Sequence, residues 1–215
     1  MYKKKSLFVT FEGIEGSGKS YQSRKLYKNL KKRRIPVLLT REPGGTSGAE
    51  KIREVILKDY FHPDSKEKFN KYTDTLLYLA ARNEHVENKI RPSILKKKIV
   101  ICDRFIDSTM AYQVYGKSVN KNFVDNIHRY ILRGIKPDLT FVLKVNLSRA
   151  IARLKKRKKK NRYDKFSRNF YAKVQDAFVK IAKKNKKRYC ILDNSKDSKK
   201  TETAILKKLI KVLYK

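Results

Sequence analysis

Tryptophan is absent from this chain of 215 residues, and cysteine and methionine occur only twice each. Cys102 and Cys190 are isolated and form no CxxC pair, so we expect two buried free thiols, and neither a disulfide nor a metal site. No run of about 18 apolar residues exists, which predicts that no segment spans a membrane. The apolar stretch near the amino terminus is too short for a secretory signal, so we expect a cytoplasmic protein.

Acidic residues are also scarce: 20 Asp and Glu stand against 56 Lys and Arg, a formal net charge of +36. Such an excess commonly indicates nucleic-acid binding. Here the lysines are spread along the whole chain, and the densest basic run, residues 155–160, contains no aromatic residue on which a base could stack. We therefore expect no specific nucleic-acid partner, although polyanions would be attracted nonspecifically at low salt.

Glycine is rare, with eight in all, and six of them fall in two short segments, 13–18 and 44–48. The first segment has the pattern GxxxxGK[ST] and consists of Gly13, Ile14, Glu15, Gly16, Ser17, Gly18, Lys19 and Ser20. In a P-loop the glycines let backbone N–H groups point at phosphate oxygens, the lysine reaches the phosphates, and the hydroxyl can bind Mg²⁺. An apolar run precedes it and a helical pattern follows, so we expect a nucleoside-triphosphate site and no chance glycine turn.

Strand-length apolar runs alternate with helical patterns from end to end, which predicts an α/β fold with a parallel sheet and helices on both faces. The apolar runs are nearly continuous, as in strands buried on both faces. The expected strands are 7–11, 37–40, 99–102, 139–145 and 189–192. The expected helices are 18–34, 47–58, 73–91, 107–115, 121–132, 148–157, 166–184 and 198–213, and we expect Pro92 to kink or reset the third, because the residue before a proline disfavours helix. We see no linker, so residues 1–215 are expected to form a single domain with a short lid at about 154–165.

Ligands of such sheets bind where the strands end. Asp103 ends the third strand, where it could join Ser20 in binding Mg²⁺, or could instead cap a helix or pair with an arginine. Arg104 follows and could grip a phosphate with two donors, or pair with a nearby carboxylate. Tyr78 and Arg82 are four residues apart on one helix face and could hold a base, although such a pair, seen alone, is more often one core residue and one surface residue.

The basic segment before residue 162 and the three histidines are less informative. The basic segment between Arg153 and Arg162 could be a mobile lid that excludes water from phosphoryl transfer, or a solvated charge run. His62, His85 and His128 are scattered without metal-ligand spacing, so we expect them at the surface.

With these pieces in place, the chain closely resembles the bacterial thymidylate kinases. The resemblance rests on segments that occur in the family's order: 11–20, 40–46, 79–82, 103–104, 108–113 and 137–139. The P-loop alone indicates an NTPase, whereas REPGGT together with DR and AYQ is highly specific. The resemblance implies the P-loop fold of nucleoside monophosphate kinases, transfer of the γ-phosphoryl group of ATP to dTMP for dTTP synthesis, a requirement for Mg²⁺, and a homodimer.

The family's residue roles carry over by position. The implied dTMP site comprises Glu15 at the 3′-hydroxyl, Tyr78 stacked on thymine, Arg82 at the base edge, Arg104 on the monophosphate and Tyr112 where a ribose 2′-hydroxyl would lie, together with Arg41, Pro43, Ser108 and Gln113. The implied ATP site comprises residues 13–20, with Lys19 bridging phosphates, and Arg153 against adenine. Ser20 and Asp103 would hold the metal. Gly16 replaces the P-loop arginine of eukaryotic members, so the catalytic arginine is expected from the lid, either Arg157 or Arg162, beside Lys19 and Arg104.

This chain also departs from the family pattern. Phe105 stands where Tyr or His is usual, and Ser20 replaces the commoner threonine. The nearest alternatives are a kinase for another monophosphate or a deoxynucleoside, and a P-loop protein whose ATP turnover depends on nucleic acid.

Overall fold

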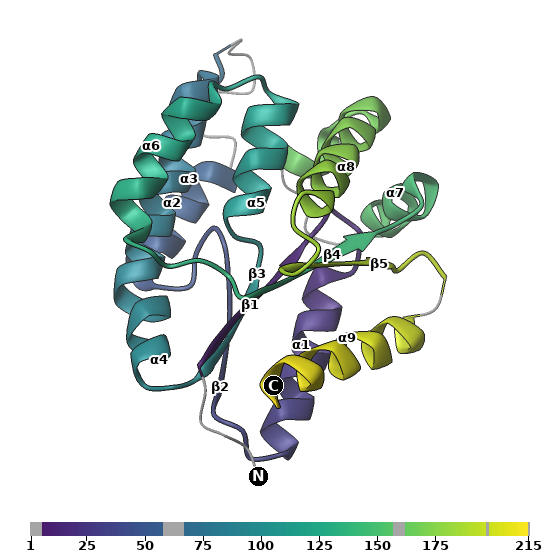
Figure 1. Cartoon of the computed structure of the whole chain (residues 1–215). Coiled ribbons are helices and arrows are strands. Elements are labelled where there is room, and N and C mark those ends of the chain that lie inside the picture. The colour runs from purple at the N-terminus through teal and green to yellow at the C-terminus, as the bar shows by residue number, and fades with distance from the viewer. Residues whose placement is uncertain (1–5, 58–66, 157–161, 197, 215) are drawn as a thin grey trace.

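Five parallel strands form one sheet in the order β2-β3-β1-β4-β5, as the computed structural model of the chain shows (Figure 1). It describes residues 6–57, 67–156, 162–196 and 198–214. The strands are β1 (Leu7–Glu12), β2 (Val37–Arg41), β3 (Ile99–Asp103), β4 (Leu139–Lys144) and β5 (Tyr189–Asp193). All four neighbouring pairs are parallel, with Phe11 opposite Asp103 on one side of β1 and Phe141 on the other. The predicted five-stranded parallel sheet is confirmed.

Helices follow every strand. They are α1 (Lys19–Lys32), α2 (Ser47–Leu57), α3 (Lys71–His85), α4 (Arg91–Leu95), α5 (Ile106–Thr109), α6 (Lys121–Leu132), α7 (Leu147–Lys155), α8 (Arg168–Lys183) and α9 (Ser198–Leu213). Two π-helical turns, Val86–Ile90 and Met110–Gly116, and a 3₁₀ turn, Arg162–Lys165, complete the described elements. Asn70, Asn120, Asn146 and Ser167 cap α3, α6, α7 and α8 with a side-chain oxygen.

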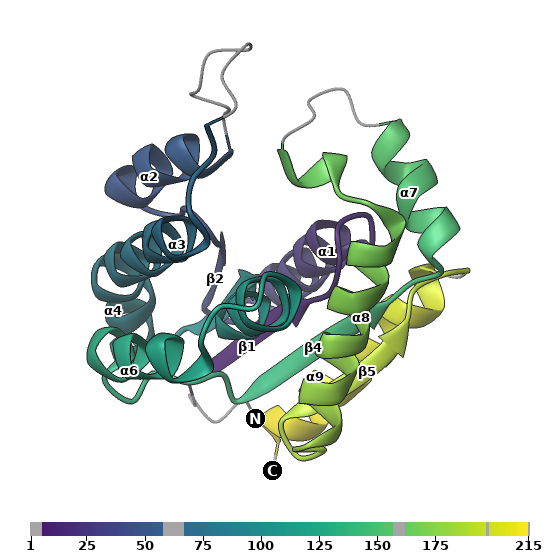
Figure 2. The same ribbon diagram turned by 90° about the horizontal axis from the view of Figure 1, so that it is seen from above.

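Alternate residues of β1 and β3 face opposite sides of the sheet, and each side has its own core. Helices lie on both sides of the sheet (Figure 2). Val9 and Ile101 pack with Leu26 of α1 and Leu209 of α9 on one side. Phe8 packs on the other side, with residues of the π-helical turn before α4. The central strands are therefore buried on both faces, as their sequences predict.

The two outer strands are not. Three of the five residues of β2 are only partly buried, and Ile191 of β5 is 39% exposed. The expectation of two buried faces is wrong for β2 and β5. Each is an outer strand that pairs with a neighbour on one side only, so its apolar side chains are covered less completely than those of the central strands.

Pro92 does not end the helix that contains it. Arg91, which precedes the proline, keeps helical angles (φ −55°, ψ −52°), and α4 continues to Leu95. Pro92 lies in the first turn of α4, directly after the wider π-helical turn, where the missing N–H is tolerated. The helix therefore resets at a π-turn, and its expected end near residue 91 is wrong. The helix expected at 107–115 is likewise α5 followed by a π-turn.

The histidine prediction is wrong for two of the three. His85 is fully buried and His128 is 8% exposed, because each hydrogen-bonds a polar group inside the molecule. His62 lies outside the described residues. Both cysteines are free, but only Cys102 is buried, while Cys190 on the edge strand is partly exposed. Within the described residues, every helix is too short or too polar to cross a bilayer.

Candidate active site

The P-loop joins β1 to α1 at the carboxyl end of the central strand. Gly18 sits immediately before α1 with φ +93°, and no side chain caps the helix, so its first N–H groups remain available to a ligand. Asn194 holds the loop from behind by donating to the Ser17 carbonyl at 2.8 Å. This arrangement forms a backbone cradle suited to an anionic ligand.

Gly16 has a steric reason to be glycine. Its φ is +73°, and a Cβ there would lie 2.6 Å from the Ala150 carbonyl oxygen of α7. A larger side chain at this position would therefore require α7 to move. The guanidinium of Arg153, one turn along α7, donates to the Gly16 carbonyl at 3.0 Å.

Lys19 is folded back over the loop. Its Nζ donates to the Ile14 carbonyl at 2.7 Å and to Ser17 Oγ at 3.3 Å, and the residue is only 6% exposed. Burial, with the nearby Arg104 charge, lowers the pKa of Lys19 from 10.5 to about 8. A desolvated ammonium of this kind gains strongly from an anionic ligand.

Ser20 and Asp103 meet across the ends of α1 and β3. The Ser20 hydroxyl donates to Asp103 Oδ2, so the hydroxyl and carboxylate predicted as metal ligands lie in direct contact. Both line the cavity described below. The described residues hold no cluster of three His, Cys, Asp or Glu side chains suited to a metal ion.

Arg104 adopts a left-handed backbone conformation, φ +74°, which aims its side chain back at the P-loop. Its Nη1 donates to the Gly13 carbonyl at 2.9 Å and to Ser108 Oγ at 3.0 Å, and its Nη2 donates to Glu15 Oε1 at 2.8 Å. Tyr112 donates to the other oxygen of Glu15. The carboxylate partner considered for Arg104 is thus present, and it is a predicted site residue.

Glu12, for which no role was predicted, supports this turn. The fully buried carboxylate accepts from the Phe105 N–H at 2.8 Å and from Ser108 Oγ at 2.6 Å. Burial, and then the Asp107 charge, raise the pKa of Glu12 to about 8. An acid at the end of an otherwise apolar strand, directly before the P-loop, was the available signal.

Tyr78 and Arg82 both reach the site from α3. Arg82 is 2% exposed and donates from Nε to Glu42 Oε2 at 2.7 Å. The Tyr78 ring meets the Tyr163 ring edge-on, with 6.2 Å between centroids. Among the described residues, the buried Nε2 amide of Gln113 has no hydrogen-bond partner. A buried donor without a partner is rare, and Gln113 lines the cavity described below, where a ligand could accept from it.

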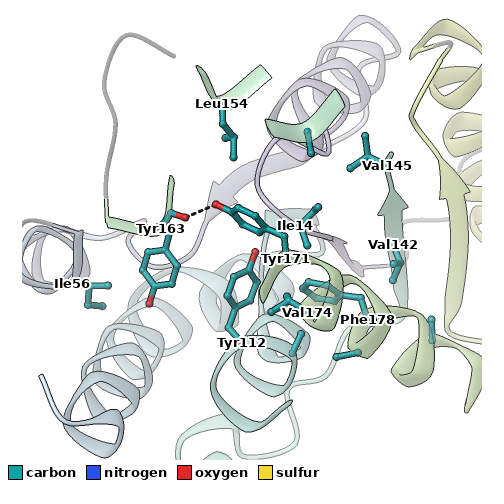
Figure 3. Packing of buried hydrophobic residues seen from close by; sticks show 14 of the residues in the cluster. Ile14, Ile56, Tyr112, Val142, Val145, Leu154, Tyr163, Tyr171, Val174 and Phe178 are labelled. Atoms are coloured by element: carbon teal, nitrogen blue, oxygen red, sulfur yellow. Dashed lines mark hydrogen bonds between the residues drawn. The ribbon is translucent and has the colours of Figure 1, made fainter. Parts of the chain in front are cut away.

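An aromatic and aliphatic cluster supports the site from below (Figure 3). The Tyr112 ring lies 6.1 Å from that of Phe178 and 6.0 Å from that of Tyr163. Tyr171 donates its hydroxyl hydrogen to the Tyr163 carbonyl, which ties the 3₁₀ turn to α8. The walls of the site are therefore fixed by packing as well as by ion pairs.

One cavity of about 500 Å³ brings most predicted residues together. Its lining includes Glu15, Gly16, Gly18, Lys19, Ser20, Arg41, Pro43, Tyr78, Arg82, Asp103, Arg104, Ser108, Tyr112, Gln113 and Arg153. Gly13, Ile14 and Ser17 shape the P-loop without lining the cavity. Arg24, Glu42, Arg53, Leu57, Thr109, Leu154 and Tyr163 also line it and were not assigned from the sequence. Arg24 could have been found, because it follows Ser20 by four residues on one helix face.

The two predicted lid arginines differ in what the structure describes. Arg157 lies outside the described residues. The guanidinium of Arg162 pairs with the buried carboxylate of Asp74 on α3, and Arg162 does not line the cavity. The other oxygen of Asp74 lies 2.7 Å from Lys117 Nζ.

Comparison with known proteins identifies the family. A family model described as thymidylate kinase matches residues 11–205. The chain belongs to the thymidylate kinase family. The thymidylate kinase of Mycoplasma capricolum subsp. capricolum is 40% identical over 194 residues, which cover 89% of this chain and 88% of that protein. The thymidylate kinase of Ehrlichia ruminantium (strain Gardel) is 38% identical over 212 residues, covering 97% and 99%.

A solved structure agrees with this thymidylate kinase assignment. The crystal structure of thymidylate kinase from Ehrlichia chaffeensis superimposes with a TM-score of 0.75 at 35% identity, covering 95% of this chain and 98% of that one. The fold is therefore that of the P-loop nucleoside monophosphate kinases, and the resemblance found in the sequence is confirmed.

Proposed function

We propose that this thymidylate kinase binds ATP over the P-loop and dTMP over the Arg82–Arg104 side of the same cavity, and transfers the γ-phosphoryl group from one to the other. Membership of the family makes the chain an ATP-dependent kinase of nucleotide biosynthesis that converts dTMP to dTDP. One observation carries the placement of the substrates: Lys19 and Ser20 share a single cavity with Arg104, Tyr78 and Arg82.

On the acceptor side, Arg104 is the proposed monophosphate ligand, because its planar fork matches two phosphate oxygens. Tyr78 would stack on the base, with Arg82 and the unpartnered amide of Gln113 at its edge. Glu15, held by Arg104 and Tyr112, would accept a hydrogen bond from the 3′-hydroxyl of the deoxyribose. Tyr112 would leave no space for a ribose 2′-hydroxyl. Arg41, Pro43 and Ser108 complete this proposed wall.

On the donor side, the N–H groups of residues 13–20 would cradle the phosphates, with Lys19 between them. Arg153 lies against Gly16, where its guanidinium could pack on adenine. The lysine would exchange its contacts with the Ile14 carbonyl and Ser17 for phosphate oxygens.

The Ser20 hydroxyl and the Asp103 carboxylate fit Mg²⁺, which prefers a few protein oxygens supplemented by phosphate and water. When bound, the ion would neutralise phosphate charge during transfer. The small protein donor set agrees with a metal that arrives with the nucleotide.

The proposed mechanism is positioning and charge neutralisation. The acceptor phosphate has a second pKa near 6, so it is largely dianionic at neutral pH and needs no general base. Lys19 and Arg104 would hold two mutually repelling anions in line. Residue 16 has no space for an arginine, which supports a catalytic arginine from a lid at about 154–165, either Arg157 or Arg162.

The proposal also covers location, domain organisation and assembly. We place the enzyme in the cytoplasm. Residues 1–215 would form a single domain that carries this lid, and two copies would form a homodimer whose interface involves the region of α2 and α3. Leu76 on α3 is 47% exposed, which supports that face as a contact surface.

A substrate panel tests the function. ADP release coupled to NADH oxidation would be measured with dTMP, dUMP, dCMP, dGMP and thymidine, each with Mg²⁺ and ATP. We expect the highest kcat/KM for dTMP, and a clear preference for any other acceptor would refute the assignment. A parallel arm with DNA or RNA and no monophosphate tests the alternative raised by the net charge of +36, which predicts nucleic-acid-dependent ATP turnover.

A further inference from the structure

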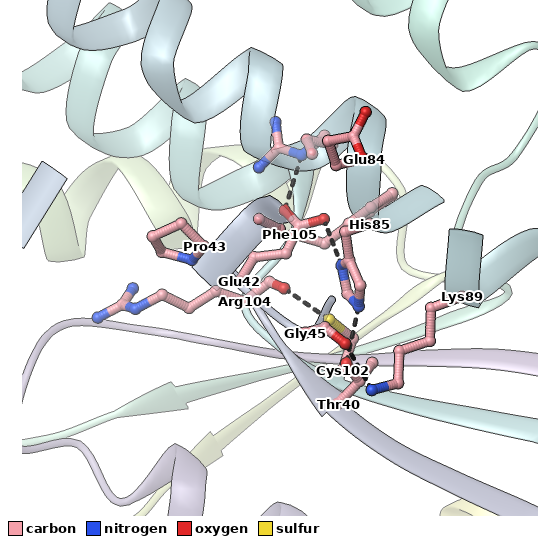
Figure 4. A network of polar contacts seen from close by, with 12 residues as sticks. Thr40, Glu42, Pro43, Gly45, Glu84, His85, Lys89, Cys102, Arg104 and Phe105 are labelled. Carbon is pink, nitrogen blue, oxygen red and sulfur yellow. Dashed lines mark hydrogen bonds and ion pairs between the residues drawn. The ribbon is translucent and has the colours of Figure 1, made fainter. Parts of the chain in front are cut away.

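A series of buried polar contacts runs from Thr40 through His85 to Glu42 (Figure 4) and ends at Arg82, which lines the cavity. Thr40 Oγ1 lies 2.7 Å from His85 Nε2, and His85 Nδ1 lies 3.0 Å from Glu42 Oε1. The other oxygen of Glu42 accepts from Arg82 Nε at 2.7 Å. Thr40, Glu42, Arg82 and His85 are all buried, so water cannot easily replace a lost partner.

The chemistry of the side chains decides which group donates and which accepts in these contacts. A guanidinium only donates and a carboxylate only accepts, so Glu42 accepts from Arg82 on one oxygen and from His85 Nδ1 on the other. A neutral His85 that donates from Nδ1 must accept at Nε2, which makes the Thr40 hydroxyl the donor there. Glu42 thus selects the histidine tautomer, and the Thr40 hydroxyl supplies the donor that this tautomer needs at Nε2.

A second set of contacts holds the other side of the guanidinium. Arg82 Nη1 lies 2.9 Å from Thr109 Oγ1 and 2.7 Å from His128 Nε2. Burial, and then the Arg82 charge, lower the pKa of His128 to about 3, so this imidazole is neutral and can accept. Because the guanidinium is planar, contacts at Nε and Nη1 together fix its plane.

The loop after β2 holds the histidine ring in place. A Cβ on Gly45 would lie 2.6 Å from the His85 ring and 2.7 Å from Thr40 Oγ1. Lys89 donates to the Gly45 carbonyl and fastens the loop against this ring (Figure 4). The backbone at residue 45 thus leaves His85 little freedom to turn away from Glu42.

We propose that Thr40 and His85 are positioning residues that orient Arg82 through Glu42, and thereby let the site distinguish a pyrimidine with a carbonyl edge from one with an amino edge. The inference rests on the proposed role of Arg82 at the base. A guanidinium can donate to the 4-carbonyl of thymine but cannot accept from the 4-amino group of cytosine. Hydrogen bonds weaken steeply as their angle departs from linearity, so a rotated Arg82 would lose part of this discrimination.

His85→Leu and His85→Asn test this as a pair. Leucine removes both ring nitrogens, whereas the asparagine amide can still donate to Glu42 near the position of Nδ1. For His85→Leu we expect about a tenfold rise in KM for dTMP, a KM for ATP within about twofold of wild type, and about a fivefold fall in the kcat/KM ratio of dTMP to dCMP. His85→Asn should recover most of that ratio. Glu84→Gln, the neighbouring residue on α3 outside the chain of contacts, is the control and should change none of these values.

An unchanged dTMP to dCMP ratio in a folded His85→Leu enzyme would overturn the inference, and so would equal increases in both KM values with the ratio preserved. If that variant does not fold, Thr40→Val against Thr40→Ser gives the same reading. Valine should lower the ratio about threefold and serine should keep it, since only serine retains the hydroxyl donor; equal ratios in the two would again overturn the inference. Failure of the proposed function has a different signature, because the wild-type enzyme would then lack dTMP-dependent turnover.

Discussion

Replacing Lys19 by methionine should make the ligand-free enzyme more stable while abolishing turnover. The lysine is 6% exposed, and its pKa falls from 10.5 to about 8, first through burial and then through Arg104. A difference of about 2.5 pH units, at about 1.36 kcal/mol per unit, corresponds to a cost of about 3 kcal/mol for holding the charged form in the folded chain at neutral pH.

Part of this gain is offset in the variant. Methionine fills a similar volume but loses the donors to the Ile14 carbonyl and Ser17 Oγ, worth about 1 kcal/mol together once both acceptors find other partners. The net expectation is a stabilisation of about 2 kcal/mol, or roughly 4–8 °C in Tm for a chain of this size. Turnover should fall by several orders of magnitude, because the charge is needed most in the transition state.

The pH dependence gives this prediction a sign. Below pH 8 the lysine is charged in both the folded and the unfolded chain, so the full cost is present. Between pH 8 and 10.5 the unfolded chain binds a proton that the folded chain does not, so wild-type stability rises with pH relative to the variant. The advantage of Lys19→Met should therefore shrink across this window.

Denaturant unfolding of wild type, Lys19→Met and Lys28→Met at pH 7, 8.5 and 10 measures these differences. Lys28 is exposed on the same helix, so its replacement should leave stability nearly unchanged. A Lys19→Met protein that is less stable than wild type at pH 7, or whose advantage grows toward pH 10, would refute the reasoning. Adding ATP with Mg²⁺ should stabilise wild type more than the variant, since the ligand relieves the buried charge.

Two further substitutions test the proposed division of the site. Arg104→Lys keeps a positive charge but loses the fork that contacts Gly13 and Ser108, so KM for dTMP should rise at least about tenfold with KM for ATP little changed; an unaltered dTMP dependence in steady-state kinetics would remove Arg104 from the acceptor site. Asp103→Asn weakens the oxygen donor beside Ser20, so the Mg²⁺ concentration for half-maximal turnover should rise about tenfold, and a Mg²⁺ titration that overlays wild type would argue against this ligand.

Much of the fold and of the cavity lining was predictable because local patterns determine both. Apolar runs located the ends of all five strands to within one residue, and motifs at strand ends meet in space because the carboxyl ends of parallel strands lie at the same edge of the sheet. Tyr78 and Arg82 were indicated by their helix spacing, and their roles, with that of Gln113, followed from the family resemblance; all three line the cavity. Local pattern is therefore sufficient where the sheet itself brings residues together.

The residues that were missed depend on tertiary partners. His85 and His128 are polar residues, and only contacts with Glu42 and Arg82 make their burial favourable. Glu12 was overlooked because its partner, the Phe105 N–H, becomes accessible only through the left-handed backbone of Arg104. Continuation of the helix through Pro92 likewise depends on a π-turn that no local signal announced.

The central place of β1 puts the P-loop between the two halves of the sheet. β3 and β2, on one wing, supply Asp103, Arg104 and Arg41, while the segments beyond β4 and β5, on the other, supply Arg153 and Asn194. The chain visits the first wing before residue 133 and the second after it. The cavity is thus assembled from two successive stretches of the polypeptide, so neither half of the chain could form it alone.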